Sequence, residues 1–168
     1  VQCAKDTRGW ITERNKSDMN KSGVKWKVRM GLSSGIGVTG VVGNEYLVIG
    51  DLIETSARML DRARHFGVYL VTDSAQDLKK TQSLHFRKLD LARSSRGAGT
   101  ALYEIFLREH EMMEQAIKLY THGLDMYYEK KYEMAVYDFK KVIQIFKEDR
   151  PSALFLEKCE DHLREKFG

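Results

Sequence analysis

Residues 30–59 read MGLSSGIGVTGVVGNEYLVIGDLIETSARM, and this stretch decides the fold. An apolar run leads into a glycine-dense turn, a second apolar run follows, and Asp51 opens a predicted helix that carries Arg58. Five glycines crowd the first part of the stretch: Gly31, Gly35, Gly37, Gly40 and Gly43. Glycine is used where φ must be positive or where a backbone or a ligand approaches closely. The stretch therefore predicts a strand, a glycine turn with a hairpin, and a helix in succession.

The composition bounds the kind of protein. With 42% hydrophobic and 31% charged residues, the 168-residue chain is typical of a soluble globular protein. Its 28 Lys+Arg against 24 Asp+Glu give a net charge of +4 that is spread along the chain, which argues against a nucleic-acid partner. Cys3 and Cys159 are too few for a disulfide framework, so we expect a reducing, cytoplasmic setting.

The termini and the apolar runs bear on location. No apolar run reaches the about 18 residues of a membrane span, and the N-terminus lacks a signal-peptide pattern. The chain begins with Val1 in a polar stretch, so we expect a fragment of a longer protein. A membrane anchor or a sensor upstream would then lie outside this sequence.

The first third of the chain predicts a linker followed by strands. Residues 1–23 are polar apart from Trp10 and Ile11, and they are interpreted as a linker or the tail of a helix. From Val24 apolar and polar residues alternate through Leu32, which predicts one half-buried strand. The alternating apolar positions are Val24, Trp26, Val28, Met30 and Leu32.

A hairpin and a helix follow. Val38–Val42 and Tyr46–Ile49 are β-prone runs joined by residues 43–45, which is typical of a hairpin. Asp51 is placed to cap the next helix with its carboxylate, and Gly67 is placed to end it in the left-handed conformation. The predicted apolar face of this helix is Ile53, Ala57, Leu60 and Ala63.

The remainder of this region predicts three strands and a helical piece. Val68–Val71 is a short buried strand and Ser74–Lys80 is helical. Leu84–Leu91 and Thr100–Phe106 form a closing pair of strands, connected by the polar residues 93–99.

Beyond Leu107 the periodicity becomes helical. Glu111–Tyr128 and Tyr132–Phe146 are predicted helices with a tight turn between them, and a third runs from Pro151 through Lys166. Small and aromatic residues match a tetratricopeptide repeat at Gly123, Tyr132, Ala135 and Phe139. One repeat cannot bury its own face, so this tail must dock on the first domain, on another subunit or on upstream repeats.

Several familiar motifs are excluded. Residues 35–40 match G-x-G-x-x-G, but a β-prone run follows where a dinucleotide fingerprint needs a helix. The Lys-Ser or Lys-Thr pair of a P-loop is missing after the glycines, and no Cys/His cluster has zinc spacing. The five histidines are dispersed, which favours structural or exposed roles.

A different family resemblance fits the order of the segments. The runs VRMGLSSGIGVTGVVG, EYLVIGDLIETSARM, VYLVTDSA and LYEI together resemble the C-terminal half of a class III nucleotidyl cyclase catalytic domain, over residues 24–106. Tyr46, Gly50, Asp51 and Arg58 stand where that family has Tyr-x-x-x-Gly-Asp-x-x-Asn-x-x-x-Arg. The helices behind are similar to the tetratricopeptide-like extension of some bacterial cyclases.

The resemblance implies an α+β fold in three parts. Residues 1–23 would be the linker or helix tail of a truncated N-terminal half. Residues 24–107 would be the C-terminal half of a ferredoxin-like cyclase domain, made of antiparallel strands plus a helix. Residues 108–168 would be an all-α, tetratricopeptide-like tail.

The resemblance also implies roles for single residues. Arg58 matches the arginine that contacts the phosphate under attack, because its five donors suit a developing negative charge. Glu54 replaces the asparagine that orients the ribose, and Leu47 replaces the Asp or Thr that helps to choose the purine. Gly50 belongs to the same substrate-binding block, where Asp51 is interpreted as a cap and turn residue. Arg93 or Arg96 stands near the place of a phosphate-binding lysine.

The implied parent protein converts ATP, or GTP, to the cyclic nucleotide and pyrophosphate as a homodimer with active sites between the subunits. Its Mg²⁺ or Mn²⁺ ions would be bound by aspartates of the N-terminal half, which the resemblance does not cover, so this fragment alone should not turn over. Two alternatives stay open. One is a degenerate cyclase domain that binds nucleotide or serves in dimerisation and regulation, and the other is a scaffold whose tail binds peptides.

Overall fold

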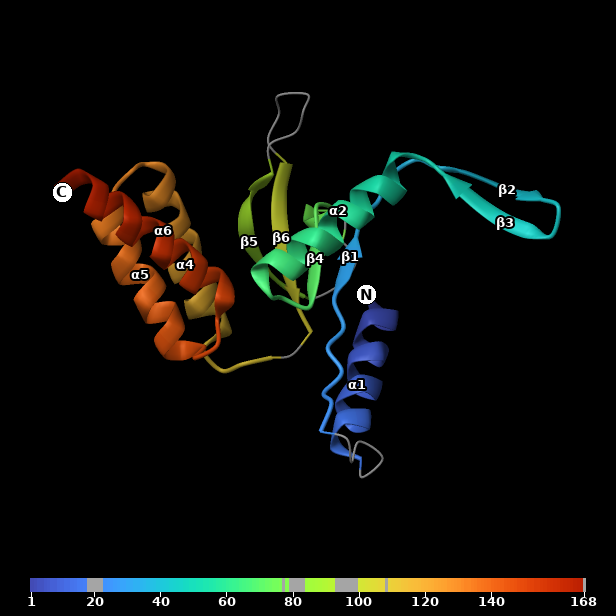
Figure 1. Cartoon of the computed structure of the whole chain (residues 1–168), viewed down its shortest axis with the longest axis horizontal. Coiled ribbons are helices and arrows are strands. Elements are labelled where there is room, and N and C mark those ends of the chain that lie inside the picture. Colours follow the sequence, from blue (N-terminus) through green and yellow to red (C-terminus); the bar gives the residue numbers. More distant parts are fainter. Residues whose placement is uncertain (18–22, 77, 79–83, 93–99, 108, 168) are drawn as a thin grey trace.

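The computed structural model describes residues 1–17, 23–76, 78, 84–92, 100–107 and 109–167. Within them the strands form a four-stranded sheet in the order β1-β4-β6-β5 and a separate hairpin of β2 and β3 (Figure 1). The strands of the larger sheet are β1 (Met30–Leu32), β4 (Leu70–Thr72), β5 (His85–Ala92) and β6 (Thr100–Phe106). Helices pack on the larger sheet, so the predicted α+β class is confirmed. The expectation of antiparallel strands alone is wrong, because β1 pairs parallel with β4.

The N-terminal segment is a helix, α1 (Gln2–Lys16), where the sequence indicated a linker or a helix tail. Only two of its side chains, those of Ala4 and Ile11, are buried. Ala4 packs with Leu70 and Phe86 of the larger sheet, so α1 covers one face of that sheet. The sparse apolar content of α1 is enough because it contacts the sheet along one narrow stripe.

The long strand predicted over residues 24–32 is wrong for its first part. Only Met30–Leu32 forms a strand, and the Val24 and Trp26 residues are 60% and 58% exposed. The amide of Asn15 holds this segment instead, donating to the Trp26 carbonyl at 2.9 Å and accepting from the Trp26 N–H at 2.8 Å. A side chain of α1 therefore supplies the hydrogen bonds that a neighbouring strand would give.

The hairpin matches the prediction closely. Strands β2 (Val38–Val42) and β3 (Glu45–Ile49) pair antiparallel with Val42 opposite Glu45, so a two-residue turn joins them. Gly43 begins that turn with φ +63°, a conformation that glycine adopts without steric cost. Figure 1 shows the hairpin projecting away from the rest of the molecule.

Helix α2 (Asp51–Phe66) corrects two predictions. The helix begins at Gly50, whose carbonyl accepts from the Ile53 N–H at 3.1 Å, so Asp51 lies inside the first turn and does not cap it. The buried residues are Met59, Ala63 and Phe66, whereas Ile53 is 44% exposed. The predicted face fails at its start because the first turns of α2 reach beyond the sheet toward the hairpin (Figure 1). Ala57, also predicted on this face, is exposed.

The larger sheet is completed after α2. Gly67 ends the helix with φ +69°, as predicted, and β4 then pairs parallel with β1 and antiparallel with β6. Strands β5 and β6 pair antiparallel with an irregularity between Lys88 and Asp90. Of the helical piece predicted over Ser74–Lys80, Ala75, Gln76 and Leu78 are helical, and residues 77, 79 and 80 lie outside the described residues.

The tail consists of α4 (Met113–Tyr128), α5 (Tyr132–Ile145) and α6 (Arg150–Phe167), as the periodicity predicts. Lys130 turns the chain between α4 and α5 with φ +61°. At Gly123 the two helices approach so closely that a Cβ would lie 3.1 Å from the Asp138 Cβ. The missing side chain at Gly123 therefore lets Asp138 and Phe139 of α5 pack closely against α4.

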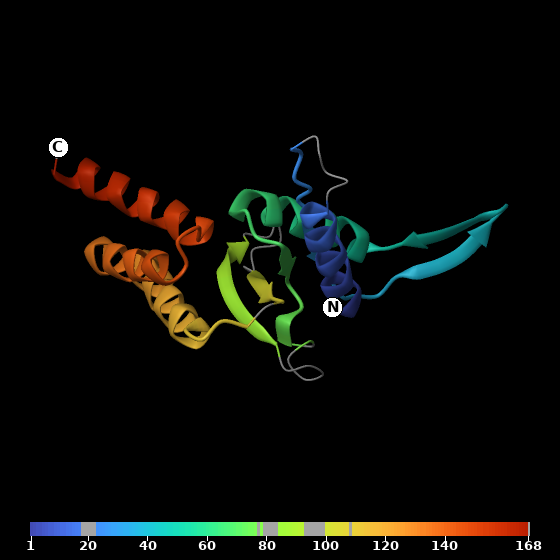
Figure 2. The same cartoon turned by 90° about the horizontal axis from the view of Figure 1, so that it is seen from below.

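One apolar core joins the tail to the sheet. Tyr120 and Phe155 of the tail share a buried cluster with Phe66 of α2 and Leu89 of β5. Figure 2 shows α4, α5 and α6 gathered on the side of the sheet away from α1. The tail therefore docks on the strands and on α2. In the described part of the chain, no helix is both long and apolar enough to cross a membrane.

Candidate functional site

The residues of the cyclase-like block lie along one continuous unit, from β3 into α2. Leu47 is on β3 opposite Gly40 and is 39% exposed, and Gly50 and Asp51 form the junction with the helix. Glu54 and Arg58 follow on successive turns of α2. The structure therefore keeps these five residues in one ridge that ends at the projecting hairpin (Figure 1).

Arg58 is bound to its own helix. Its guanidinium lies 3.5 Å from the Glu54 carboxylate and donates to the Thr55 hydroxyl at 3.1 Å. The Arg58 and Glu54 side chains are 61% and 75% exposed. An exposed pair at this spacing contributes about 0.3–0.5 kcal/mol, so a stronger anion would displace Glu54 easily.

Gly50 is required by its surroundings. Its φ of +154° is rarely adopted by other residues, and a Cβ there would lie 2.9 Å from the Ile36 carbonyl oxygen. The turn after β1 thus passes directly over the start of α2. Asp51 lies in the first turn of α2, where a negative charge is favourable to the helix dipole. Arg93 and Arg96 lie outside the described residues.

A cluster of small polar side chains, which the sequence analysis does not single out, lies where the parallel strands β1 and β4 end. The Ser34 N–H donates to the Ser74 hydroxyl at 2.9 Å, and that hydroxyl donates to the Asp73 carboxylate at 2.8 Å. The Ser33 hydroxyl lies 3.3 Å from the same carboxylate. These bonds join the glycine turn to the end of β4 and fix where the hairpin leaves the sheet.

A buried ion network was missed from the sequence. Arg87 of β5 is 1% exposed, and its guanidinium contacts Glu104 of β6 at 2.5 Å and Asp149, just before α6, at 2.8 Å. The guanidinium carbon also lies over two aromatic rings, 4.6 Å from the centroid of Tyr120 and 5.2 Å from the centroid of Phe106. No local pattern points to it, because the two partners are 17 and 62 residues away along the chain.

The charges of this network and its burial shift the pKa values of Arg87 and Glu104. Burial alone would lower the pKa of Arg87, but the carboxylates of Glu104 and Asp149 outweigh it and raise that pKa, so the guanidinium stays charged. Burial raises the pKa of Glu104 above its usual value, and the attraction of Arg87 opposes that shift. Asp149 also accepts from the Ser152 N–H at 3.0 Å, which caps α6. One carboxylate thus serves both the helix and the sheet.

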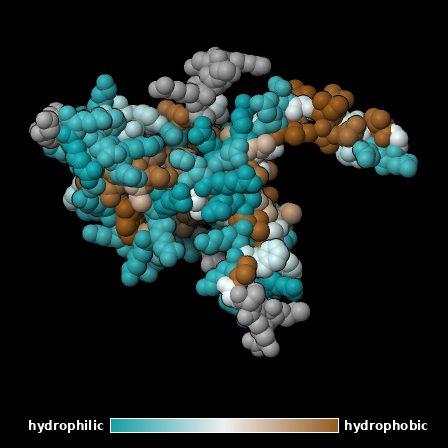
Figure 3. Space-filling view, in the orientation of Figure 1, coloured by the Kyte–Doolittle hydropathy of each residue, from teal (hydrophilic) through white to brown (hydrophobic). Residues whose placement is uncertain are grey.

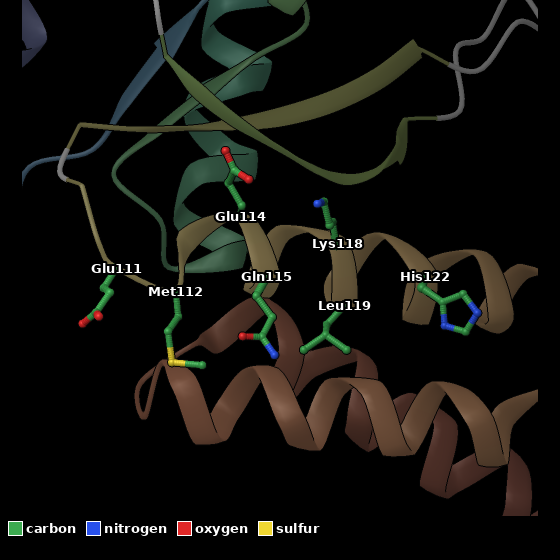
Figure 4. A pocket seen from close by; sticks show the side chains of 7 residues that line it. All are labelled: Glu111, Met112, Glu114, Gln115, Lys118, Leu119 and His122. Carbon is green, nitrogen blue, oxygen red and sulfur yellow. The ribbon is translucent and has the colours of Figure 1, made fainter.

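The outer face of α4 carries a shallow hollow of about 590 Å³. Its lining residues are Glu111, Met112, Glu114, Gln115, Lys118, Leu119 and His122. Figure 4 shows Met112, Gln115 and Leu119 pointing to one side of the helix and Glu114 and Lys118 to the other. His122 is held by Asp138 of α5 at 2.5 Å. Such an open surface suits a peptide or a neighbouring helix, and the predicted peptide contact of the tail stays a prediction.

No three histidine, cysteine or acidic side chains come together in the described residues in a way that could hold a metal ion. A scan of known protein families, a search of curated proteins and a search of solved structures all found no match for this chain.

Proposed function

We propose that this chain is part of a class III nucleotidyl cyclase of the cytoplasm, an adenylate cyclase that converts ATP to cyclic AMP and pyrophosphate. In this proposal residues 24–107 are the C-terminal half of the catalytic domain and residues 108–168 are a tetratricopeptide-like tail. The observation that carries it is the ridge from β3 into α2, which presents Leu47, Gly50 and Arg58 at the edge of a free apolar hairpin.

The hairpin supports a homodimer. Apolar side chains on both of its faces are exposed, and Figure 3 shows them as a brown arm. They are Ile36, Val38, Val41, Val42, Tyr46, Leu47, Val48 and Ile49. A two-stranded hairpin is marginally stable alone, and an apolar surface of this kind marks an interaction site. In the proposal a second subunit covers the arm, and the active sites lie between the two subunits.

Arg58 would then act on the substrate of the partner subunit. Its guanidinium exchanges the exposed Glu54 carboxylate for a phosphate group of ATP. The phosphate carries more charge and accepts two parallel hydrogen bonds through two of its oxygens. Removing one such electrostatic donor costs about 10²–10³ in turnover. Leu47 offers an apolar contact to the base and no hydrogen bond, so ATP and GTP remain to be compared. In the proposal, Mg²⁺ or Mn²⁺ would be bound by aspartates of the N-terminal half of the catalytic domain, and the residues of this chain would bind and orient the nucleotide.

The Glu54–Arg58 pair also favours the alternative function, a degenerate domain that binds nucleotide or regulates through dimerisation. A carboxylate at Glu54 cannot donate to a ribose hydroxyl, and it occupies the arginine that the reaction needs. In that case the same residues bind nucleotide or contact a second subunit without turnover.

Cyclic-nucleotide formation by the full-length protein, with ATP or GTP and Mg²⁺ or Mn²⁺, separates the two. We expect product from ATP, and a loss of at least about 100-fold in turnover for Arg58→Ala. Arg62→Ala, which removes an exposed arginine one turn further along α2, is the matched control and should keep its rate. A folded dimer that forms no product with any metal or purine would contradict the enzyme and leave the regulatory module.

A further inference from the structure

A groove of about 640 Å³, distinct from the ridge of Arg58, lies where the turn from α5 to α6 meets the end of β6 and α1. On one side it is lined by α1 and the segment before β1. On the other side it is lined by residues 67–69 before β4, by the end of β6 with the described residues that follow it, and by the turn from α5 to α6. Gly67 follows the last residue of α2, so the groove lies more than two helical turns from Arg58. A volume of this size is ordinary for a small-molecule site.

The floor of the groove is formed by the buried ion network, in which two carboxylates surround one guanidinium. Arg87 and Glu104 line it, but the Arg87 guanidinium is already bound by the carboxylates of Glu104 and Asp149. These groups therefore define the shape of the site and are not free to bind a ligand.

The rim carries cations that are not committed in this way. Lys27 and Arg29 line the wall next to α1, and Lys147 and Arg150 line the wall next to the tail. Within the described part of the chain, none of these four side chains has an ion-pair partner. Counted over the whole lining of the groove, six cations face four carboxylates, so an anion is favoured between the walls.

Aromatic side chains line the same groove. Trp26 is 58% exposed on the rim, with its backbone fixed by Asn15, and Phe106 and Phe146 stand 6.3 Å apart between ring centroids. Flat aromatic surfaces beside basic side chains bind molecules that combine a ring with negative charge, as nucleotides do.

We propose that this groove binds a nucleoside phosphate, with the base against Trp26 and the phosphates between the two cationic walls. The site is independent of the proposed cyclase activity, because it uses no residue of the Arg58 ridge. A ligand there touches the N-terminal segment, the sheet and the tail together, so its binding stabilises the docking of the tail.

The fluorescence of Trp26 gives a direct test. Trp10→Phe leaves Trp26 as the only tryptophan of the chain, and ATP, AMP, adenosine and tripolyphosphate are titrated into that variant. We expect saturable quenching by ATP, weaker binding of AMP, and little binding of adenosine or tripolyphosphate alone. Binding should weaken as salt is added, because the contacts to phosphate are charged.

Single substitutions test which basic side chains of the two walls bind the phosphates. In the Trp10→Phe background, Arg29→Ala and Lys147→Ala should each weaken ATP binding tenfold or more, and Lys147→Arg should retain most of it. Lys118→Ala, on the outer face of α4, and Arg62→Ala, at an exposed position of α2, should leave the affinity unchanged. Thermal unfolding confirms that each variant is folded. Absence of quenching at millimolar ATP, equal affinity for tripolyphosphate alone, or loss of binding on Arg58→Ala with Lys147→Ala unaffected would overturn the proposal.

Discussion

At Gly31 the backbone of β1 meets the backbone of α2. A Cβ on this residue would lie 2.2 Å from the Ser56 carbonyl oxygen and 2.4 Å from the Leu60 nitrogen. Neither atom belongs to a flexible side chain, so the helix itself would have to move. The glycine density that marks this part of the sequence therefore has a specific cause here, while at Gly40 a Cβ would meet nothing within 4 Å.

Gly31→Ala should accordingly lower the free energy of unfolding by at least about 2 kcal/mol, because overpacking against a backbone has no cheap relief. Urea unfolding followed by circular dichroism measures this. Gly40→Ala, in an exposed strand of the hairpin, is the matched control and should change stability by less than about 0.5 kcal/mol. Equal effects of the two substitutions would contradict the close approach.

Cys159 predicts a response to alkaline pH. Burial raises the pKa of its thiol from the usual 9.0 to about 11, so the folded protein holds this proton more tightly than the unfolded chain. The contribution of the protonated Cys159 thiol to folding stability is fully present below pH 9 and is lost as the pH rises toward about 11. Burial raises the pKa of the Tyr120 phenol in the same direction. Stability should therefore fall above pH 9.

Thiol titration with a chromogenic disulfide at pH 8 checks the burial behind that shift. Cys3 is exposed and Cys159 is buried, so the native chain should release one equivalent at once and the second only on unfolding. Two equivalents released immediately from the folded chain would show that Cys159 is accessible and remove the basis for the alkaline transition.

At the scale of elements, α2 has two unlike halves. Its C-terminal half is buried through Met59, Ala63 and Phe66, and its N-terminal half stands with the hairpin outside the apolar core. The first turn of α2 packs on one side against the turn after β1, and its other side leaves Ile53 exposed to another molecule. The hairpin and the start of α2 form one projecting element, and the proposed dimer would use it.

Val41→Asp tests that element. Val41 is 70% exposed on β2, so the substitution should leave the unfolding transition unchanged while shifting sedimentation from dimer to monomer. Lys118→Asp, an exposed site on α4 away from the hairpin, serves as the control for added negative charge. A Val41→Asp protein that remains dimeric would place the interface elsewhere.

At the scale of the whole molecule, the sheet and the tail share one core and one ion network. Arg87 and Glu104 come from the sheet, while Asp149 precedes α6 of the tail. Tyr120 adds a hydrogen bond from its hydroxyl to the Leu89 carbonyl at 3.0 Å. The tail is therefore fixed to the sheet by directional contacts as well as by apolar burial.

Asp149→Asn should weaken that attachment. It keeps a side chain able to cap α6 but removes one of the two charges that compensate Arg87, so we expect a loss of about 3 kcal/mol in unfolding free energy. Asp61→Asn, which breaks an exposed pair with Arg64 on α2, should cost less than about 0.5 kcal/mol. Denaturant unfolding compares the two, and equal small losses would show that the network contributes little.

The sequence by itself determined the order and type of most elements, because periodicity, glycines and Pro151 act over a few residues. It placed the hairpin, the end of α2 at Gly67 and the three tail helices with small errors. It also grouped Leu47, Gly50, Glu54 and Arg58, since they are neighbours along the chain.

Only the tertiary structure decided which of those residues have partners. It shortened the predicted strand at 24–32 to Met30–Leu32, where Asn15 of α1 takes the hydrogen bonds of Trp26 instead. It also left Ile53 exposed, because the start of α2 packs on its other side against the turn after β1. It brought Arg87 to Asp149 across 62 residues and opened the groove beside them. These features depend on contacts between segments far apart in the chain, and local sequence patterns carry no record of such contacts.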